Sequence, residues 1–362
     1  MKKAVVTLFA SLVLGTFGAQ QQVAETLHRR SYFYAGGKYV AQGNSSIMEG
    51  AMYVERLTPE RVIQPFPLLV VHGHGMTGTN FLNTPDGRQG WGDFFLSQGY
   101  EVSIHIPKEC QTLLSTFDTF TIESYFTATQ RSKLWPQAIL HTQWPGNGSM
   151  GDDTFDSFYA STVPSLVSEM EASQKMKEAG PALLDKIGPT TKPVILLTHS
   201  ESGPLGWILG DSRPNLIKTI VALEPGGPPF VNAIFPPPAP ARPFGVTEIS
   251  VAYEPPLSSP DDLKRVVASN SSLFTCFQQA EPARKLVNLM KIPILVVTAE
   301  ASFHAVLDGC TVDYLKQAGV KVDHINLGNV GIHGNGHMMF MEKNTIEIAK
   351  LVQKWIVGNV DN

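Results

Sequence analysis

The chain has 362 residues, of which 43% are hydrophobic and 17% charged, and this composition excludes disordered and fibrous proteins. The length is enough to bury one large core, so a single large domain with inserted loops is the simplest organisation. The formal net charge is -4 and no cluster of Lys and Arg forms a basic stripe, so we expect no nucleic-acid partner.

The N-terminus is typical of a secretion signal. Two lysines precede an apolar run from Ala4 to Gly18, and small residues at the end of this run fit a signal-peptidase site. We expect residues 1–19 to be removed and residues 20–362 to form the mature protein. The run is too short for a comfortable membrane span, and no later segment reaches that length. The sequence therefore predicts a secreted protein, extracellular or periplasmic, that has no membrane segment after the signal is cleaved.

Short apolar runs alternate with amphipathic stretches along the rest of the chain. The expected strands are residues 67–71, 100–106, 193–198, 219–223, 293–298 and 322–327. The expected helices are residues 91–98, 181–187, 312–318 and 345–357. Strands and helices that alternate in this way predict the α/β class, with a mostly parallel sheet covered by helices on both faces.

Two segments break this alternation. Residues from about 107 to 176 are rich in aromatic and turn residues, and residues from about 228 to 285 contain the proline-rich run 236–240. Proline cannot donate to a sheet ladder, so these segments must lie over the edge or the top of the sheet. We interpret both as insertions that form a lid, and ordinary surface loops are the alternative.

The chain has three cysteines, so they cannot all pair within one chain. In an oxidising compartment, one disulfide and one free thiol is the simplest arrangement. We favour a bridge between Cys276 and Cys310, because the segment between these two residues has the pattern of compact helix and strand. Cys110 would then be free. Asn-x-Ser sequons, which matter only in a host that glycosylates, begin at Asn44, Asn147 and Asn270.

The most informative segment is Leu-Leu-Thr-His-Ser-Glu-Ser-Gly-Pro at residues 196–204. An apolar strand leads directly into Ser200, and small residues, Thr198 and Ser202, lie two positions to either side. This is the context of a nucleophile elbow, a strained turn between strand and helix where bulky neighbours would clash. The usual pattern has glycine at both small positions, so the motif is less specific here, and a helix-capping serine is the alternative.

A serine that takes part in acyl transfer also needs amide donors for the oxyanion. Residues 72–78, His-Gly-His-Gly-Met-Thr-Gly, follow the first apolar strand, and their glycines allow backbone amides to turn toward the serine. We expect the donors to be the amides of His74 and Glu201. The pair His72 and His74 also resembles metal ligands, but no third and fourth ligand has convincing spacing. We therefore expect no metal and no cofactor.

The base and the acid of such a site must come from later loops. His333 and His337 both follow the last expected strand and precede the C-terminal helix, and His337, next to that helix, is preferred. Glu224 and Glu300 both end strands between the serine and these histidines. Either carboxylate could orient the imidazole and stabilise its charged form. Spacing alone leaves the two nearly even.

Four segments carry a family resemblance, in this order along the chain: residues 83–91, 198–203, 223–225 and 333–339. From about residue 32 to residue 358 the chain is similar to a subfamily of secreted α/β-hydrolase esterases of bacteria and fungi. The resemblance implies the α/β-hydrolase fold and a triad of Ser200, Glu224 and His337. Some members carry two adjacent cysteines in the oxyanion loop, where this sequence has a His-Gly pair, so no role of those cysteines is transferred.

These observations predict a secreted serine hydrolase that cleaves carboxylic ester bonds through an acyl-enzyme on Ser200. The aromatic and proline-rich insertions indicate a small-molecule ester substrate of apolar or aromatic character. One alternative keeps the triad but hydrolyses a lactone or a C–C bond, or closes a ring, on a secondary metabolite. A second alternative is a binding protein without catalytic activity.

Overall fold

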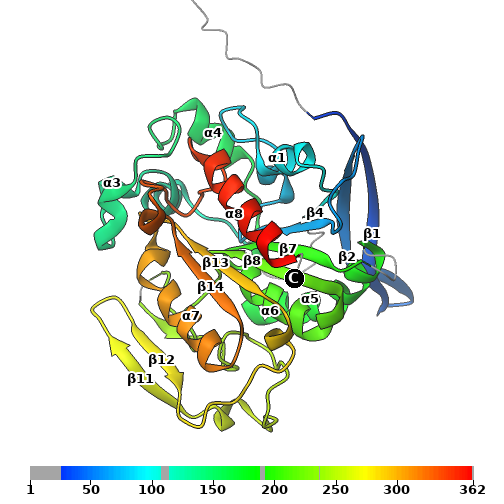
Figure 1. The fold of residues 1–362 in the computed structure, drawn as a ribbon, viewed down its shortest axis with the longest axis vertical. Helices are drawn as coiled ribbons and strands as arrows, with labels where there is room; N and C mark the ends of the chain where they lie inside the picture. The colour runs from blue at the N-terminus through cyan, green and yellow to red at the C-terminus, as the bar shows by residue number, and fades with distance from the viewer. Residues whose placement is uncertain (1–25, 107–113, 188–191, 236, 361–362) are drawn as a thin grey trace, which may run out of the picture.

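The computed structural model describes residues 26–106, 114–187, 192–235 and 237–360, and within them the fold centres on an eight-stranded sheet (Figure 1). Its strands are β1 (His28–Gln42), β2 (Ser45–Pro59), β3 (Leu68–Val71), β4 (Val102–Ile106), β7 (Val194–His199), β8 (Ile217–Leu223), β13 (Ile294–Thr298) and β14 (Val322–Asn326). Their order across the sheet is β1-β2-β4-β3-β7-β8-β13-β14. From β4 to β14 all neighbours are parallel, which confirms the predicted mostly parallel sheet.

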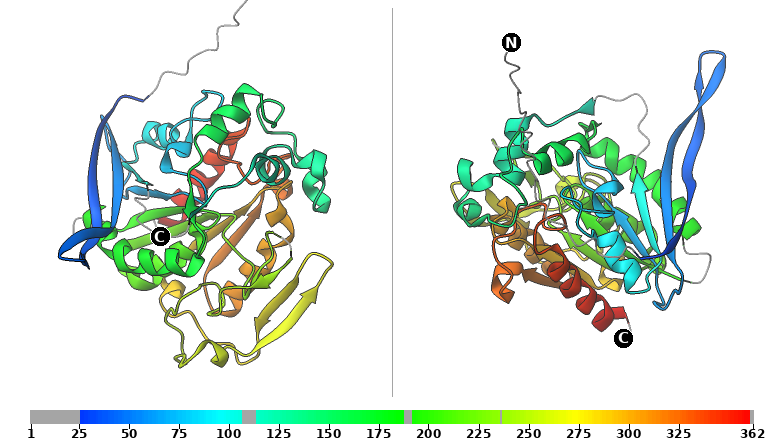
Figure 2. Two further views of the ribbon diagram at one scale, coloured as in Figure 1. Left: turned by 180° about the vertical axis from the view of Figure 1, so that it is seen from behind. Right: turned by 90° about the horizontal axis from the view of Figure 1, so that it is seen from above.

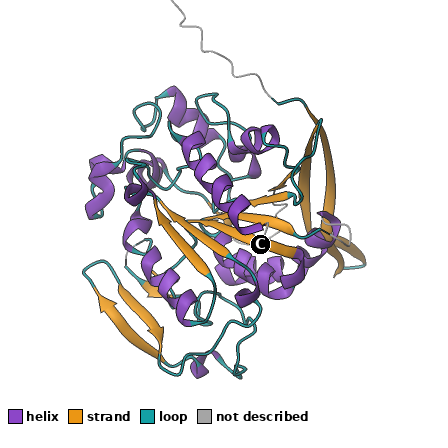
Figure 3. Cartoon of the chain, in the orientation of Figure 1, coloured by secondary structure: helices purple, strands orange, loops and turns teal. Residues whose placement is uncertain are grey.

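Helices cover both faces of this sheet (Figure 3). One face carries α1 (Trp91–Ser97) and α8 (Thr345–Val360), and the other carries α5 (Glu169–Ile187), α6 (Ser202–Ser212) and α7 (Asp308–Gln317). Strand β7 shows why its sequence is continuously apolar: Ile195 and Leu197 pack with α1 and α8, whereas Leu196 packs with α5 and α6. Among the described residues, no helix has the length and apolar composition needed to cross a membrane.

The ribbon of β1 and β2 was not predicted from the sequence. The two strands pair in antiparallel register at the edge of the sheet, and the ribbon extends beyond the body of the molecule (Figure 2). Its tyrosines support the pairing, since Tyr34 lies opposite Tyr53 and the ring of Tyr32 stacks on Tyr53 with centroids 5.6 Å apart. Most of β1 is exposed, so it lacks the apolar run that marks a buried strand.

The first insertion, between β4 and α5, contains α2 (Thr119–Ile122), α3 (Thr129–Ser132) and α4 (Asp153–Ala160). The helix expected at residues 181–187 is longer in the structure, since α5 begins at Glu169 and continues through Pro181. The expected helix covered only the stretch in which apolar residues return at helical spacing. Residues 169–180 are nonetheless mostly good helix formers, and they extend the helix toward its N-terminus.

The second insertion, between β8 and β13, contains a hairpin of β11 (Arg265–Asn270) and β12 (Thr275–Gln279). A disulfide joins Cys276 in β12 to Cys310 in α7, with their Cα atoms 5.8 Å apart. The predicted pairing is therefore confirmed. The expected signal segment and Cys110 lie outside the described residues.

Replacing both bridged cysteines, Cys276→Ser with Cys310→Ser, should lower the free energy of unfolding by about 3 kcal/mol, because the bridge closes a long loop in the unfolded chain. Urea unfolding followed by circular dichroism measures the change. Cys110→Ser is the control and should unfold like the wild type. Equal stability of the double variant and the wild type would show that the bridge does not form in solution.

Candidate active site

Ser200 lies on a sharp turn between β7 and α6. Its φ angle is 57°, in the left-handed region that side-chain-bearing residues rarely adopt. Backbone hydrogen bonds hold this strained conformation: the amide of Ser200 donates to the carbonyl of Leu223 at 3.0 Å, and its carbonyl accepts from the amides of Gly203 and Gly226 at 2.9 and 2.8 Å. The chain thus turns at Ser200 as a nucleophile elbow does, and the turn is fastened to the end of β8.

Two glycines allow neighbouring loops to approach this turn. A Cβ atom on Gly203 would lie 2.3 Å from the Cβ of Pro225, and one on Gly73 would lie 2.9 Å from the Cβ of Ser200. Both contacts are too short for any larger residue. The loops after β3 and β8 are therefore packed directly against the elbow.

Ser202 takes the place of the second glycine of the usual motif, and its side chain is fully buried. Its Oγ accepts from the amide of His199 at 2.8 Å and donates to the carbonyl of Val71 at 2.8 Å. The hydroxyl therefore ties the elbow to the end of β3. This contact accounts for a serine at a position where the pattern usually has glycine.

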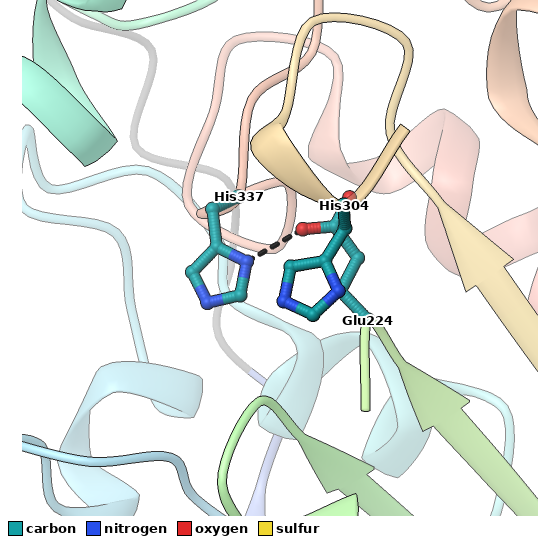
Figure 4. Close-up of side chains that lie close together, drawn as sticks. All are labelled: Glu224, His304 and His337. Carbon is teal, nitrogen blue, oxygen red and sulfur yellow. Dashed lines mark hydrogen bonds and ion pairs between the residues drawn. The ribbon is translucent and has the colours of Figure 1, made fainter. Parts of the chain in front are cut away.

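Glu224 follows the last residue of β8 and points at His337 (Figure 4). Its Oε2 lies 2.5 Å from Nδ1 of His337 and accepts from Oγ of Ser302 at 2.7 Å, while its Oε1 accepts from the amide of Ala299 at 2.7 Å. The other candidate acid, Glu300, lies 2.9 Å from Nδ1 of His333 instead. Of the two carboxylates, only Glu224 contacts His337.

Burial controls the protonation of this pair. It raises the pKa of Glu224, and the neighbouring His304 is the largest influence in the opposite direction. Burial also lowers the pKa of His337 well below its usual value, and the neighbouring imidazoles of His199 and His304 lower it further. His337 is therefore neutral at neutral pH, the form in which its other ring nitrogen can accept a proton.

His199 supports His337 from a second side. The two rings lie 4.4 Å apart, and Nε2 of His199 donates to the backbone carbonyl of His337 at 3.1 Å. A carbonyl can only accept, so Nε2 carries the proton. Burial lowers the pKa of His199 to about 3, so this imidazole stays neutral.

The residues expected to supply oxyanion donors flank the serine. Nδ1 of His74 lies 3.1 Å from a carboxylate oxygen of Glu201, which brings the loop after β3 to the start of α6. The amide of Gly75, next in this loop, donates to Oγ of Ser165 at 2.8 Å. The N-terminus of α6, which is the positive end of its helix dipole, lies beside this loop.

A pocket of about 250 Å³ opens in front of Ser200 and His337. Aromatic side chains form much of its wall: Phe117, Phe126, Phe158, Phe235 and Phe303. Residues of both segments that were interpreted as insertions line this pocket, and those of the second reach only as far as Glu248. The hairpin of β11 and β12 lies outside the lining and is held to α7 by the disulfide.

A metal ion fits this site poorly. Among the described residues, the His, Cys, Asp and Glu side chains close enough to share an ion are Glu224, His304 and His337, whose ligand atoms lie within 4.8 Å of one another. The two imidazole rings are parallel, with an interplanar angle of 4° and centroids 5.0 Å apart. The lone pair of an imidazole nitrogen lies in the plane of its ring, so stacked parallel rings cannot both point at one ion.

Sequence reasoning missed three residues of this site. Ser302 and His304 lie beyond the end of β13, and His199 was noted only as a neighbour of the serine. The spacing of His304 and Asp308 was the available signal, since side chains four residues apart can meet where the chain is helical. His304 lies in a short 3-10 helix (Phe303–Val306), and Asp308 is the first residue of α7.

Ser202→Ala should lower the free energy of unfolding by about 1 to 3 kcal/mol, because the buried amide of His199 loses its partner. Chemical unfolding followed by circular dichroism measures this loss. Ser212→Ala, at the other end of α6, is the matched control and should change stability by less than about 0.5 kcal/mol. If the two variants are equally stable, the hydroxyl of Ser202 does not fasten the elbow.

Comparison with known proteins places this site in a family. No family model matches the chain. A protein from Fungal sp. (strain ATCC 74256), named probable secreted lipase phiG, is 47% identical over 339 residues, which are 90% of this chain and 89% of that protein. The solved structure of a novel bacterial esterase is 21% identical and superposes with a TM-score of 0.59 over 94% of this chain and 100% of that one, which confirms the fold. The chain therefore belongs to the family of the fungal protein, the secreted esterases and lipases of the α/β-hydrolase fold.

Proposed function

We propose that this carboxylic ester hydrolase acts through an acyl-enzyme on Ser200, with His337 as base and Glu224 as the acid of the triad. The observation that carries the proposal is the arrangement of three distant residues at one edge of the sheet. Ser200 and His337 line the same pocket, and Glu224 is hydrogen-bonded to the far side of the His337 ring.

In this mechanism His337 takes the proton of Ser200 as its hydroxyl oxygen attacks the ester carbonyl. The amides of His74 and Glu201 stabilise the oxyanion of the tetrahedral intermediate. His337 then gives the proton to the departing alcohol, which leaves an acyl-enzyme. Water, deprotonated by His337, attacks the acyl group, and Ser200 recovers its proton as the carboxylic acid leaves. Glu224 holds the imidazole through Nδ1 and stabilises its charged form.

The pocket supports an apolar or aromatic small-molecule ester as the substrate. Aromatic rings cover much of its wall, and such walls usually bind apolar groups. Three charged residues of its wall contact one another: Nη1 of Arg242 donates to Glu169 at 3.0 Å, and the backbone amide of Arg242 donates to the carboxylate of Glu248 at 2.7 Å. These contacts join α5 to the second insertion and leave the aromatic part of the pocket for the substrate.

The protein is proposed to act outside the cytoplasm after removal of residues 1–19. The fungal relative is named a secreted lipase. The bridge between Cys276 and Cys310 fits an oxidising compartment, where disulfides form and persist.

Ser200→Ala should lower kcat on short p-nitrophenyl esters by about five to six orders of magnitude, because the acyl-enzyme can no longer form. The purified wild type should also be labelled by a fluorophosphonate, and the variant should not. A panel of esters and lactones, run with both proteins, identifies the bond that is cleaved. Near-full esterase activity in Ser200→Ala would refute the proposal.

Glu224→Gln should lower kcat/KM by about 10⁴-fold, since an amide can neither hold the imidazole in the same tautomer nor stabilise its cation. Glu300→Gln is the matched control, because Glu300 also follows a strand but contacts His333. Its kcat/KM should stay within about threefold of the wild type. The opposite ranking of the two variants would make Glu300 the acid.

A further inference from the structure

A second histidine–carboxylate pair lies against the proposed triad. Nδ1 of His304 lies 2.6 Å from Oδ1 of Asp308, and the two side chains are 0% and 1% exposed. The ring of His304 stacks on that of His337, with centroids 5.0 Å apart and planes within 4° (Figure 4). The mechanism above assigns no role to this pair.

A further contact fixes the carboxyl group of Asp308. Its Oδ2 accepts from Oγ1 of Thr298 at 2.6 Å, and that hydroxyl lies 2.9 Å from Nε2 of His324. The single proton of the threonine goes to the carboxylate, so His324 donates to the threonine oxygen. With one oxygen satisfied by Thr298, the other is left to hold the proton on Nδ1 of His304.

The charged groups around His304 favour its protonated form. Burial alone would lower the pKa of His304, but the charge and hydrogen bond of Asp308, and the charge of Glu224, raise it above the usual value. Its Nε2 is buried with no hydrogen-bond partner, and one ring nitrogen of His304 lies within 4.8 Å of ligand atoms of Glu224 and His337. The charge of Arg242 acts in the opposite direction, and the imidazoles of His337 and His199, whose own pKa values the charge of His304 lowers, also lie near it.

We propose that His304 is a positioning residue whose cation, fixed by Asp308, keeps the pair of Glu224 and His337 free of an extra proton, so that His337 remains a base at lower pH. A cation stacked on His337 opposes the uptake of a proton by the pair, because the added charge would lie beside it. This inference rests on the proposed function of the triad. It concerns the pH at which the triad works and adds no chemical step.

His304→Gln tests the inference through the pH profile of kcat/KM for a short p-nitrophenyl ester, whose acid limb reports protonation of the free enzyme's base. Loss of the neighbouring cation should move this limb upward by about 1 to 2 pH units, so that kcat/KM on the limb falls about 10- to 100-fold. KM should change little, because the wild-type residue acts on the base. His333→Gln, in an exposed pair with Glu300, is the matched control and should leave the limb in place.

Asp308→Asn gives a second, independent variant. Without its carboxylate partner His304 becomes neutral, so the limb should again move upward, and the double variant should move it no further than His304→Gln alone. Circular dichroism shows which variants are folded. If His304→Gln does not fold, Asp308→Asn carries the test with the same expected shift.

The outcomes separate this inference from the proposed function. If Ser200→Ala abolishes esterase activity but the limb of the folded variants stays in place or moves downward, the inference is overturned and the triad stands. If Ser200→Ala keeps its activity, the proposed function fails before any His304 variant is measured. An upward shift in both variants, with none in His333→Gln, supports the inference.

Discussion

The hydrogen bond between Glu224 and His337 is the interaction on which this site depends, because it joins residues 113 positions apart. A buried carboxylate is costly unless it is fully hydrogen-bonded. Glu224 meets that requirement because β8 lies beside β13, so that Ala299 and Ser302, which follow β13, reach its two oxygens. The parallel sheet thus positions the partners of Glu224 as well as Glu224 itself. By bringing the carboxyl ends of its strands to one edge, it supplies the hydrogen-bond partners that this buried carboxyl group needs.

The apolar runs at β3, β7 and β13 were predictable because strands buried on both faces leave a continuous hydrophobic signal. The elbow at Ser200 was predictable for the same reason, since it directly follows such a run. The ribbon of β1 and β2 was not, because an exposed edge strand carries no such run. Spacing alone could not choose between Glu224 and Glu300, and only the family resemblance indicated Glu224. Both follow neighbouring strands, and only the path of the later loop decides which one meets His337.

Several titratable side chains are buried together at this edge, and their charges are coupled. His199 is kept neutral and bound to the backbone of His337, whereas His304 faces a carboxylate on each side. The imidazoles on the two sides of His337, one tilted and one stacked on its ring, both lower its pKa but are held by different partners. Burying such groups reduces stability unless each is matched, and natural proteins accept this at functional sites.

Side chains of the first insertion contact the candidate active site directly. Its Phe126 lies 5.6 Å from the ring of His337, and Nε1 of its Trp135 donates to the carbonyl of Ala301 at 3.0 Å. Ala301 belongs to the loop that holds Glu224. The first insertion therefore affects both the wall of the pocket and the positions of His337 and Glu224. Exchanging the segment between relatives, in evolution or by grafting, would alter the surroundings of His337 together with the shape of the pocket.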